Sequence, residues 1–357
     1  MRRLIVVDAR GTPGFVDDLR RAWDAGDAVL PLDPRLPGPA RDRLLAAARP
    51  GESVEDGDAL VVATSGTTGE PKAAVLTHDA VAASARATSA RLAVDPGRDR
   101  WLACLPLAHV GGLAVVTRAL VTGTPLTLHD GVDAAAVEAA AATGGCTLVS
   151  LVPTVLARLD ASGFRTVVLG GSAMPPDLPA NAVTTYGMTE TGSGIVYDGV
   201  PLDGVEVRVA DGEIRLRGPM LARAYRDGTD PRDRDGWLPT GDAGAWDAEA
   251  GRLRVFGRTD DVVVTGGENV WPAAVERVLA RHPAVAEVAV VGRPDPEWGQ
   301  VVVALVVAAD PADPPSLLDL RDAVRAELPA YAAPRQLDLV PDLPRTASGK
   351  VARTRLD

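Results

Sequence analysis

A loop suited to binding a polyphosphate is the most distinctive stretch of this chain. Residues 64–72, TSGTTGEPK, follow the apolar run 59–63 and supply hydroxyls, glycines and a lysine: Thr64, Ser65, Gly66, Thr67, Thr68, Gly69 and Lys72. Glycines let backbone amides approach a ligand, hydroxyls donate hydrogen bonds, and a lysine adds a compact charge. The loop is not a Walker A motif, because Pro71 stands where that motif requires its second glycine. The alternative is a polar surface turn.

Three other stretches carry groups that suit the rest of a nucleotide. In residues 184–194, TTYGMTETGSG, Tyr186 can stack on a flat ring, Thr189 can donate to a phosphate and Glu190 can bind a hard cation. In residues 235–244 and 257–261, Asp242 has a carboxylate suited to two vicinal hydroxyls, and Arg258 can add donors to the same sugar or phosphate. Each residue taken alone is also compatible with a solvated loop.

The chain uses lysine at only two places. Of its 37 basic residues 35 are arginine, and the lysines are Lys72 and Lys350, both in loops rich in glycine, serine and threonine. Chance is one explanation, but a site that needs a compact ammonium group explains the pattern better.

Composition limits the class of protein. The 357 residues allow two domains, and 46% hydrophobic residues allow a core in each. A net charge of -11 argues against nucleic acid or an anionic membrane as partner. No apolar run is long enough for a signal peptide or a membrane span, and the two cysteines lack metal-ligand spacing, so we expect a cytoplasmic protein with reduced thiols.

From residue 59 onward, strands and helices alternate. We expect strands over 59–63, 101–105, 147–151 and 166–169 and helices over 79–91, 133–142 and 154–160, with Thr77 or Asp79 as an N-cap. Before them, helices over 16–23 and 40–48 are joined by an extended, proline-rich connection. This alternation predicts parallel α/β sheets, in which loops at the carboxyl ends of strands form the binding crevice. The loops are 64–72, 106–112 and 170–175.

After residue 204 the pattern changes. Two alternating segments around Asp211 and Gly212 predict a hairpin and a small antiparallel β subdomain. The last stretch has its own strands, a glycine loop over 265–269 and helices over 271–281 and 317–327. We therefore expect a large N-terminal α/β domain over residues 1–259, including the β subdomain, and a small mobile α+β domain over 260–357.

Five motifs in this order resemble the adenylate-forming enzymes: acyl-CoA synthetases, peptide-synthetase adenylation domains and luciferases. They are TSGTTGEPK, YGMTETGSG, GWLPTGDAG, GRTDDVVVTGGENVWPAAVE and PRTASGKVAR, and they span residues 59–355. Together they are far more specific than any one of them.

The resemblance implies ATP and Mg²⁺ as ligands. It assigns the 64–72 loop to the β and γ phosphates, Tyr186 with Gly187 to adenine, Thr189 to the α-phosphate and Glu190 to Mg²⁺. It also assigns Asp242 and Arg258 to the ribose. Lys350 corresponds to the lysine that bridges the acyl carboxylate and the α-phosphate. The implied reaction joins the acid to AMP, releases pyrophosphate and then transfers the acyl group to a thiol.

The same family predicts a rotation of the small domain about Asp260 between the two steps. In the second arrangement Gly266 and Gly267 resemble the wall of the pantetheine tunnel, and Trp298 lines the site of coenzyme A. Asp260→Pro is therefore expected to spare adenylation and to block thioester formation.

The acyl pocket is implied by three segments: His109 beside it, and the loops Gly170, Gly171, Ser172 and Gly192, Ser193, Gly194 as its floor. A compact chain with GGENVWPAAVE and a GGS loop is most similar to the o-succinylbenzoate:CoA ligases of menaquinone synthesis. Ser172, Ser193 and Thr154 are then candidates for holding the second carboxylate of that acid. The alternatives are another aryl- or acyl-CoA ligase and a stand-alone enzyme that loads a carrier protein.

Two departures from the family pattern remain. Ala73 stands after Lys72 where glycine is usual, and the phosphate loop begins early, so part of the family's N-terminal subdomain is expected to be absent. A homodimer that completes the crevice is then one possibility.

Overall fold

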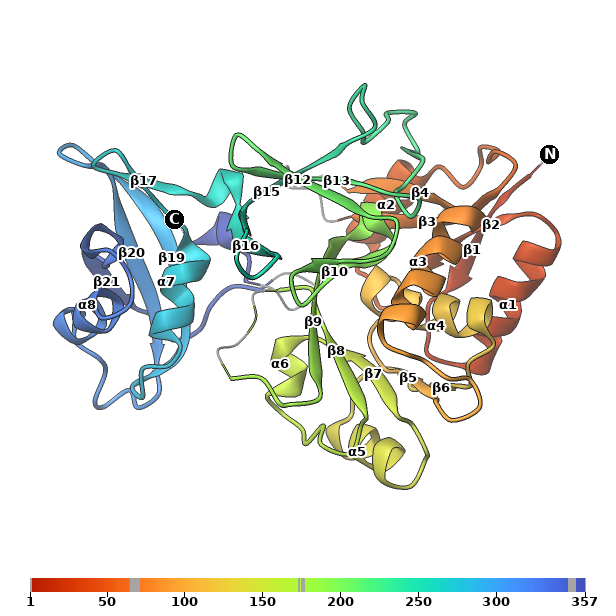
Figure 1. Ribbon diagram of the computed structural model, residues 1–357, viewed down its shortest axis with the longest axis horizontal. Coiled ribbons are helices and arrows are strands. Elements are labelled where there is room, and N and C mark those ends of the chain that lie inside the picture. Colours follow the sequence, from red (N-terminus) through yellow and green to blue (C-terminus); the bar gives the residue numbers. More distant parts are fainter. Residues whose placement is uncertain (1, 65–70, 173, 175–176, 346–350, 357) are drawn as a thin grey trace.

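The computed structural model describes residues 2–64, 71–172, 174, 177–345 and 351–356. Within these residues the strands form four β-sheets, three before residue 259 and one after residue 262 (Figure 1). The expected fold class, parallel α/β sheets with an antiparallel subdomain and a small α+β unit, is confirmed. The division at residue 260 stays a prediction. In the described part of the chain no helix is long and apolar enough to cross a membrane.

The first sheet carries the two ends of the phosphate loop. Its strands, in order, are β1 (Leu4–Asp8), β2 (Ala28–Leu32), β3 (Asp58–Thr64), β4 (Lys72–Thr77) and β14 (Ala224–Tyr225). The helices α1 (Pro13–Asp24) and α2 (Gly38–Ala48) accompany it. Thr64 pairs with Lys72 across the antiparallel strands β3 and β4, so these two predicted site residues are neighbours. Pro31, in the expected extended connection, lies in the strand β2, where the whole apolar run AVLPL is buried.

The second sheet is the parallel sheet that the alternation predicts. Its order is β11 (Val200–Pro201), β10 (Ser193–Tyr197), β9 (Ala182–Met188), β8 (Thr166–Leu169), β7 (Leu148–Leu151), β5 (Trp101–Ala103) and β6 (Leu126–Leu128). Strands β5 to β9 pair in parallel, whereas β10 returns antiparallel to β9. The helix α5 (Ala134–Ala142) begins at its N-cap Asp133. The helix expected over 154–160 is a single turn, α6 (Pro153–Leu156), because Asp160 accepts from the Ser162 amide in a turn.

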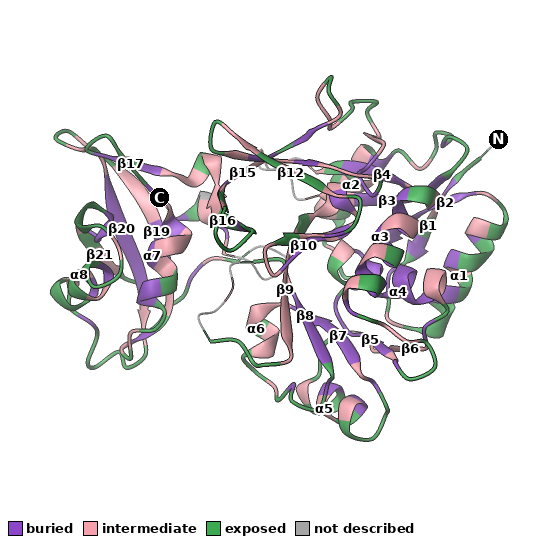
Figure 2. Ribbon diagram, in the orientation of Figure 1, coloured by how far each residue is buried: buried purple, intermediate pink, exposed green. Residues whose placement is uncertain are grey.

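Two helices pack between these sheets. They are α3 (His78–Arg91), capped by the Thr77 hydroxyl that accepts from the Ala80 amide, and α4 (Val110–Thr122). Leu76 of the first sheet, Trp101 and Leu148 of the second and Leu113 of α4 belong to one buried cluster. Figure 2 shows strands β5, β7 and β8 as buried along most of their length. This shared core fixes Thr64 and Lys72, the two ends of the predicted phosphate loop, relative to the strand ends of the second sheet.

The third sheet is antiparallel, with the order β12 (Glu206–Ala210), β13 (Glu213–Arg217), β15 (Leu238–Asp247) and β16 (Arg252–Arg258). Its first turn is the predicted hairpin, in which Asp211 and Gly212 both have positive φ, 53° and 79°. A one-turn helix, η2 (Thr259–Asp261), leads from β16 to the last sheet.

The last sheet has a core of its own. Its strands are β18 (Glu268–Val270), β17 (Val263–Thr265), β20 (Gly299–Ala308), β19 (Val285–Asp295) and β21 (Gln336–Leu339), with helices α7 (Pro272–Leu279) and α8 (Leu317–Arg325). Val275 and Leu279 of α7 meet Val302 and Leu320 in a cluster that includes no residue before Val263. The glycine loop expected over 265–269 is instead a tight hairpin between β17 and β18.

Candidate active site

The structure brings together the three residues predicted for adenine and ribose. The Tyr186 hydroxyl donates to Asp242 Oδ2 at 2.8 Å, and Arg258 Nη1 lies 3.4 Å from Asp242 Oδ1. Burial and the neighbouring Asp242 carboxylate raise the pKa of Tyr186, so its hydroxyl keeps its proton and acts as a donor. The second and third sheets thus meet at a carboxylate that is already oriented.

Local sequence explains how Asp242 is placed. Gly241 has φ of 65°, which favours glycine, and a Cβ there would lie 2.5 Å from Arg258 Nη2, so a side chain at this position would displace the guanidinium. The Thr240 hydroxyl donates to the Ile214 carbonyl at 2.7 Å and accepts from the Asp242 amide at 3.0 Å. These contacts hold the carboxylate over the paired strands β15 and β16.

A second group of residues gathers at the expected phosphate end. Glu190 lies in η1 (Thr189–Thr191), and its Oε1 accepts from the Tyr225 hydroxyl at 2.7 Å. The Lys72 ammonium lies 4.9 Å from the centroid of the Tyr225 ring. Burial and then the Glu190 carboxylate raise the pKa of Tyr225, which keeps it a donor. Gly187 must be a glycine, because its Cβ would lie 2.2 Å from the Ser193 carbonyl oxygen.

Five residues of the loop, Ser65, Gly66, Thr67, Thr68 and Gly69, and also Lys350 lie outside the described residues. Arg353, three positions after Lys350, donates to both carboxylate oxygens of Glu276 at 2.6 and 2.8 Å and to the Val290 carbonyl. Hydrogen bonds from Arg353 therefore hold the segment after Lys350 against α7 and β19.

The acid groups at this end suit a magnesium ion that arrives with a nucleotide. Among the described residues no three His, Cys, Asp or Glu side chains form a metal-binding cluster. Magnesium in nucleotide sites takes one or two carboxylates and completes its shell with phosphate oxygens and water. Glu190 next to Thr189 fits that donor set.

The predicted acyl-pocket loops also converge. A Cβ on Gly170 would lie 2.5 Å from Thr185 Oγ1, and one on Gly194 would lie 2.8 Å from Thr185 Cβ. Both loops therefore lie close to the same side chain, that of Thr185. Thr185 was not predicted as a site residue. Gly171, at φ of 86°, and Ser172 are exposed beside them.

His109 lies at the start of α4, as its N-cap residue. Its carbonyl oxygen accepts from the Gly112 and Leu113 amides, and Gly112 has no room for a Cβ, which would lie 2.4 Å from the Leu105 carbonyl. Its side chain is exposed, and the pKa of Asp33 in the N-terminal segment is lowered by hydrogen bonds from Arg35 and more weakly by the charge of His109.

Sequence reasoning missed two polar residues at the site. Tyr225, the partner of Glu190, comes from a two-residue strand, and no pattern in the sequence pointed to it. Arg118 Nη2 donates to Ser193 Oγ at 3.0 Å from below the pocket floor, where Gly192 has φ of 67°. A lone charge inside the apolar helix VGGLAVVTRALVT was the signal that could have found it.

The residues predicted for coenzyme A lie together in the last sheet. A Cβ on Gly266 would lie 2.8 Å from Trp298 Cε3, and the Gly266 amide donates to the Trp298 carbonyl. Gly267 has open space around it. The Arg335 guanidinium covers the Trp298 ring at 3.8 Å from its centroid. Asp260 lies in η2, exposed, 3.8 Å from Arg258 Nη2.

The candidate site draws its residues from the first three sheets, and a fourth sheet with a core of its own follows. The family model for AMP-binding enzymes matches residues 41–226, and that for the AMP-binding enzyme C-terminal domain matches residues 274–350. The chain belongs to this family.

Among relatives, a probable 2-succinylbenzoate–CoA ligase of Mycobacterium tuberculosis is 41% identical over 380 residues, covering 100% of this chain and 97% of that protein. A 2-succinylbenzoate–CoA ligase of Listeria monocytogenes is 36% identical, covering 84% of this chain and 69% of the relative. Among solved structures, an o-succinylbenzoate CoA synthetase of Bacillus subtilis with its acyl-adenylate intermediate has a TM-score of 0.87 at 28% identity, covering 100% of this chain and 89% of that one. The amide bond synthetase McbA of Marinactinospora thermotolerans has a TM-score of 0.85 at 28% identity, covering 99% and 89%.

Proposed function

We propose that this protein is an ATP-dependent acid:CoA ligase that converts 2-succinylbenzoate into its CoA thioester, a step of menaquinone synthesis. The observation that carries the proposal is the end-to-end similarity to a probable 2-succinylbenzoate–CoA ligase, 41% identical over 100% of this chain and 97% of that relative. The nucleotide site built by Tyr186, Glu190 and Asp242 supports it.

In the first step an oxygen of the acid attacks the α-phosphorus of ATP, the bond to the β-phosphate oxygen breaks and pyrophosphate leaves. Asp242 accepts from the ribose hydroxyls, Tyr186 packs on adenine, and Thr189 and Lys350 contact the α-phosphate. Glu190 would hold a Mg²⁺ ion that arrives with ATP, and that ion would supply positive charge that lessens the repulsion between the two anions. Removing a cationic group such as Lys350 is expected to slow this step by about 10² to 10³-fold.

In the second step the sulfur of CoA attacks the acyl carbon, and AMP leaves with the bonding electrons. Gly266, Gly267 and Trp298 are the proposed contacts of the pantetheine arm. We further propose that the last domain turns about Asp260 between the steps, which brings this face to the adenylate.

One observation favours a second candidate, because the amide bond synthetase McbA has a nearly identical TM-score. An enzyme of that kind would share the adenylation step and use an amine in place of a thiol. A stand-alone enzyme that loads a carrier protein would likewise differ only in the second step.

The test is pyrophosphate release with ATP, Mg²⁺ and 2-succinylbenzoate, compared with benzoate and medium-chain fatty acids, each with and without CoA. CoA-dependent turnover with 2-succinylbenzoate alone is expected. Turnover only with another acid would refute the assignment of 2-succinylbenzoate as the substrate. If the acyl adenylate accumulates in the presence of CoA but is consumed when an amine is added, the second candidate would be favoured. A homodimer and a cytoplasmic location stay predictions, which gel filtration and cell fractionation check.

A further inference from the structure

Tyr225, which donates to the Glu190 carboxylate, lies in a strand of only two residues. This strand, β14, pairs antiparallel with β4, and the main-chain amides of Arg223 and Arg226, one on each side of it, donate to β4 carbonyls at 2.9 Å. A strand this short makes few ladder bonds. Other contacts must therefore hold the Tyr225 side chain where it meets Glu190.

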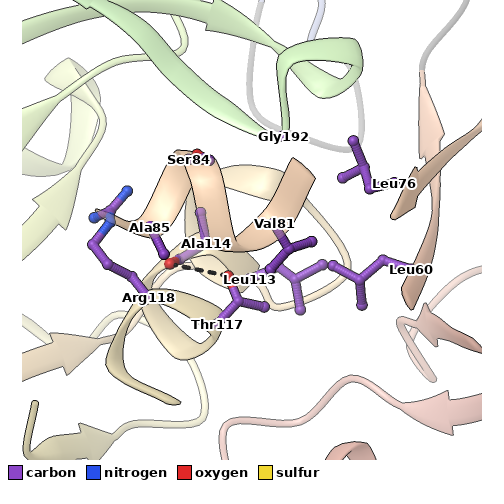
Figure 3. Close-up of a pocket in the computed structure, with 10 residues that line it drawn as sticks. All are labelled: Leu60, Leu76, Val81, Ser84, Ala85, Leu113, Ala114, Thr117, Arg118 and Gly192. Atoms are coloured by element: carbon purple, nitrogen blue, oxygen red, sulfur yellow. Dashed lines mark hydrogen bonds between the residues drawn. The ribbon is translucent and has the colours of Figure 1, made fainter. Parts of the chain in front are cut away.

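The loop that carries Glu190 also rests on β4. Gly192, which ends η1, lies against Leu76 of that strand, where a Cβ on the glycine would be 3.6 Å from Leu76 Cδ1 (Figure 3). In addition, the Ala222 amide donates to the Glu190 carbonyl at 2.7 Å. Tyr225 and Glu190 thus meet because both are placed on the same strand. A shift of β14 relative to β4 would lengthen and break the hydrogen bond between them.

Arg226 connects one side of β14 to the end of helix α2. Its guanidinium donates to four main-chain carbonyls: Ala48 at 2.9 Å, Arg49 at 3.0 Å, Ser53 at 3.2 Å and Glu52 at 3.3 Å. Ala48 is the last residue of α2, and Arg49, with φ of 50°, is its C-cap. Carbonyls at the C-terminus of a helix lack helical partners and carry partial negative charge, so a guanidinium suits them. This one side chain therefore determines how the end of β14 lies on the connection between α2 and β3.

Arg223 connects the other side of β14 to the start of β3. Its Nε and Nη2 donate to the two carboxylate oxygens of Asp58, each at 3.0 Å, and its Nη1 donates to Glu55 Oε1 at 2.7 Å. The Asp58 side chain is fully buried. A bidentate pair of this kind fixes the orientation as well as the distance of its two partners. Two arginines thus hold the strand of Tyr225 from both sides against residues 48–58.

A comparable arginine elsewhere in the chain separates a structural role from a positioning role. Arg91 donates to the two carbonyls of β11, which is also a strand of two residues. No residue proposed to contact ATP lies in β11. The difference between the two arrangements is therefore what the held strand carries, and β14 carries the tyrosine that orients Glu190.

We propose that Arg226, supported by Arg223, is a positioning residue for the adenylation step. It fixes β14 on β4 so that Tyr225 holds Glu190 in the orientation that binds the Mg²⁺ ion of ATP, and it acts through Tyr225 rather than by touching the nucleotide. The inference rests on the proposed function, but it concerns the nucleotide site and not the acid substrate.

The test measures binding of ATP by isothermal titration calorimetry with no acid present, once with excess Mg²⁺ and once with EDTA. We expect Arg226→Met to weaken binding of Mg·ATP by up to about 10-fold, as Tyr225→Phe does, and to leave binding of metal-free ATP close to that of wild type. The double variant should bind Mg·ATP no more weakly than Tyr225→Phe alone, because Arg226 then has no hydroxyl left to position. Arg91→Met is the matched control and should bind Mg·ATP as the wild type does.

Unchanged binding of Mg·ATP by Arg226→Met would overturn the inference. Equal losses with and without metal, or a further loss in the double variant, would also overturn it, since either result means an effect that does not pass through Tyr225. Because no acid is present, a failure of 2-succinylbenzoate to react would refute only the proposed substrate, whereas a wild type that does not bind Mg·ATP would overturn both proposals. If thermal melting shows that Arg226→Met does not fold, Arg226→Gln is measured in the same way, with the same expected and overturning results.

Discussion

Glu190, the residue proposed to hold magnesium, is oriented by a tyrosine 35 positions away. The Tyr225 hydroxyl donates to Glu190 Oε1 at 2.7 Å, while Lys72 lies against the face of the same ring. One side chain therefore positions both a carboxylate and an ammonium at the phosphate end. A carboxylate ligand whose orientation is fixed binds a metal more tightly than one that rotates freely.

Tyr225→Phe removes the hydroxyl and keeps the ring beside Lys72. We expect kcat/KM for adenylation to fall about 10-fold and the Mg²⁺ concentration for half-maximal rate to rise, because Glu190 loses its partner. Pyrophosphate release measured over a Mg²⁺ series checks both. Tyr331→Phe, at a tyrosine that is 40% exposed, is the control. An unchanged Mg²⁺ dependence in Tyr225→Phe would show that Tyr225 does not orient the ligand.

The residues that sequence predicted and those it missed differ in a physical way. Tyr186, Asp242 and Arg258 lie in glycine-rich motifs whose backbone requirements leave a mark on the sequence, as Gly241 does beside Arg258. The position of Tyr225 at the site, in contrast, depends on the pairing of β14 with β4. Such contacts arise from tertiary packing, which composition and periodicity do not encode.

At the scale of elements, the hairpin between β17 and β18 packs closely against the Trp298 ring at Gly266. Gly266 and Gly267 both have left-handed φ, 59° and 85°, but only Gly266 lies against the tryptophan. The sequence predicted a strand over 262–264 and a loop over 265–269, so it missed only the short strand β18, which begins within the expected loop. A side chain at either position would strain the backbone, and the contact with Trp298 distinguishes the two.

This pair gives a matched comparison. Alanine at either position carries a left-handed penalty of about 1 to 2 kcal/mol, whereas only Gly266→Ala displaces Trp298. We expect Gly266→Ala to slow thioester formation about 10-fold more than Gly267→Ala, with adenylation alike in both, because Trp298 is the proposed CoA contact. Single-turnover transfer from preformed adenylate to CoA measures this. Equal rates of thioester formation in the two variants would show that Trp298 is not part of the CoA site.

Hydrogen bonds join the amino-terminal ends of three strands of the parallel sheet, the ends that face away from the crevice. Asp99, Thr147 and Arg165 precede β5, β7 and β8, and Asp99 accepts from Arg165 Nε at 3.0 Å, from Arg165 Nη2 at 2.9 Å and from Thr147 at 2.7 Å. Burial favours a raised pKa of Asp99, but hydrogen bonds from Arg165, the Asp95 amide and Thr147 outweigh it, and the pKa is lowered.

Because the folded-state pKa of Asp99 lies below its unfolded value, its contribution to stability is present above about pH 4 and is lost as the pH falls through the folded pKa. We expect Asp99→Asn to lower the free energy of unfolding at pH 7 by about 2 kcal/mol. Urea unfolding from pH 7 down to pH 3 should show the difference from wild type shrink below pH 4. Asp18→Asn, at an exposed ion pair with Arg21, should change little. A difference that is constant with pH would contradict this assignment.

At the scale of the whole molecule, the last sheet with α7 and α8 has a core separate from the rest, and the chain reaches it through η2. The strands and helices of the last hundred residues predicted an α+β unit here, since periodic segments are the strongest sequence signal, and the division at residue 260 stays a prediction. The relative placement of the two units during each step is a property of the reaction cycle, which sequence patterns do not contain.

Asp260→Pro tests the proposed rotation, because proline restricts φ at the turn between the units. We expect adenylation to proceed at close to the wild-type rate and thioester formation to fall by about 10²-fold or more. Asp260→Ala, which leaves φ free, should retain both steps. Measuring the half-reactions separately distinguishes the cases, and an equal loss of both steps in Asp260→Pro would refute a hinge at this position.

The scarcity of lysine has a practical consequence for handling the protein. Lys72 is exposed beside Tyr225, and Lys350 is the only other lysine in the chain. Reagents that couple to primary amines therefore have these two side chains, and otherwise an α-amino group, to react with. Dye labelling or attachment to a sensor surface through amines would modify the residues proposed to contact ATP. Maleimides offer little instead, since Cys104 and Cys146 are buried and burial raises the pKa of the Cys104 thiol to about 12. An affinity tag is the attachment that leaves the enzyme able to turn over, and protection of Lys72 from acylation by ATP would give a simple footprint of nucleotide binding.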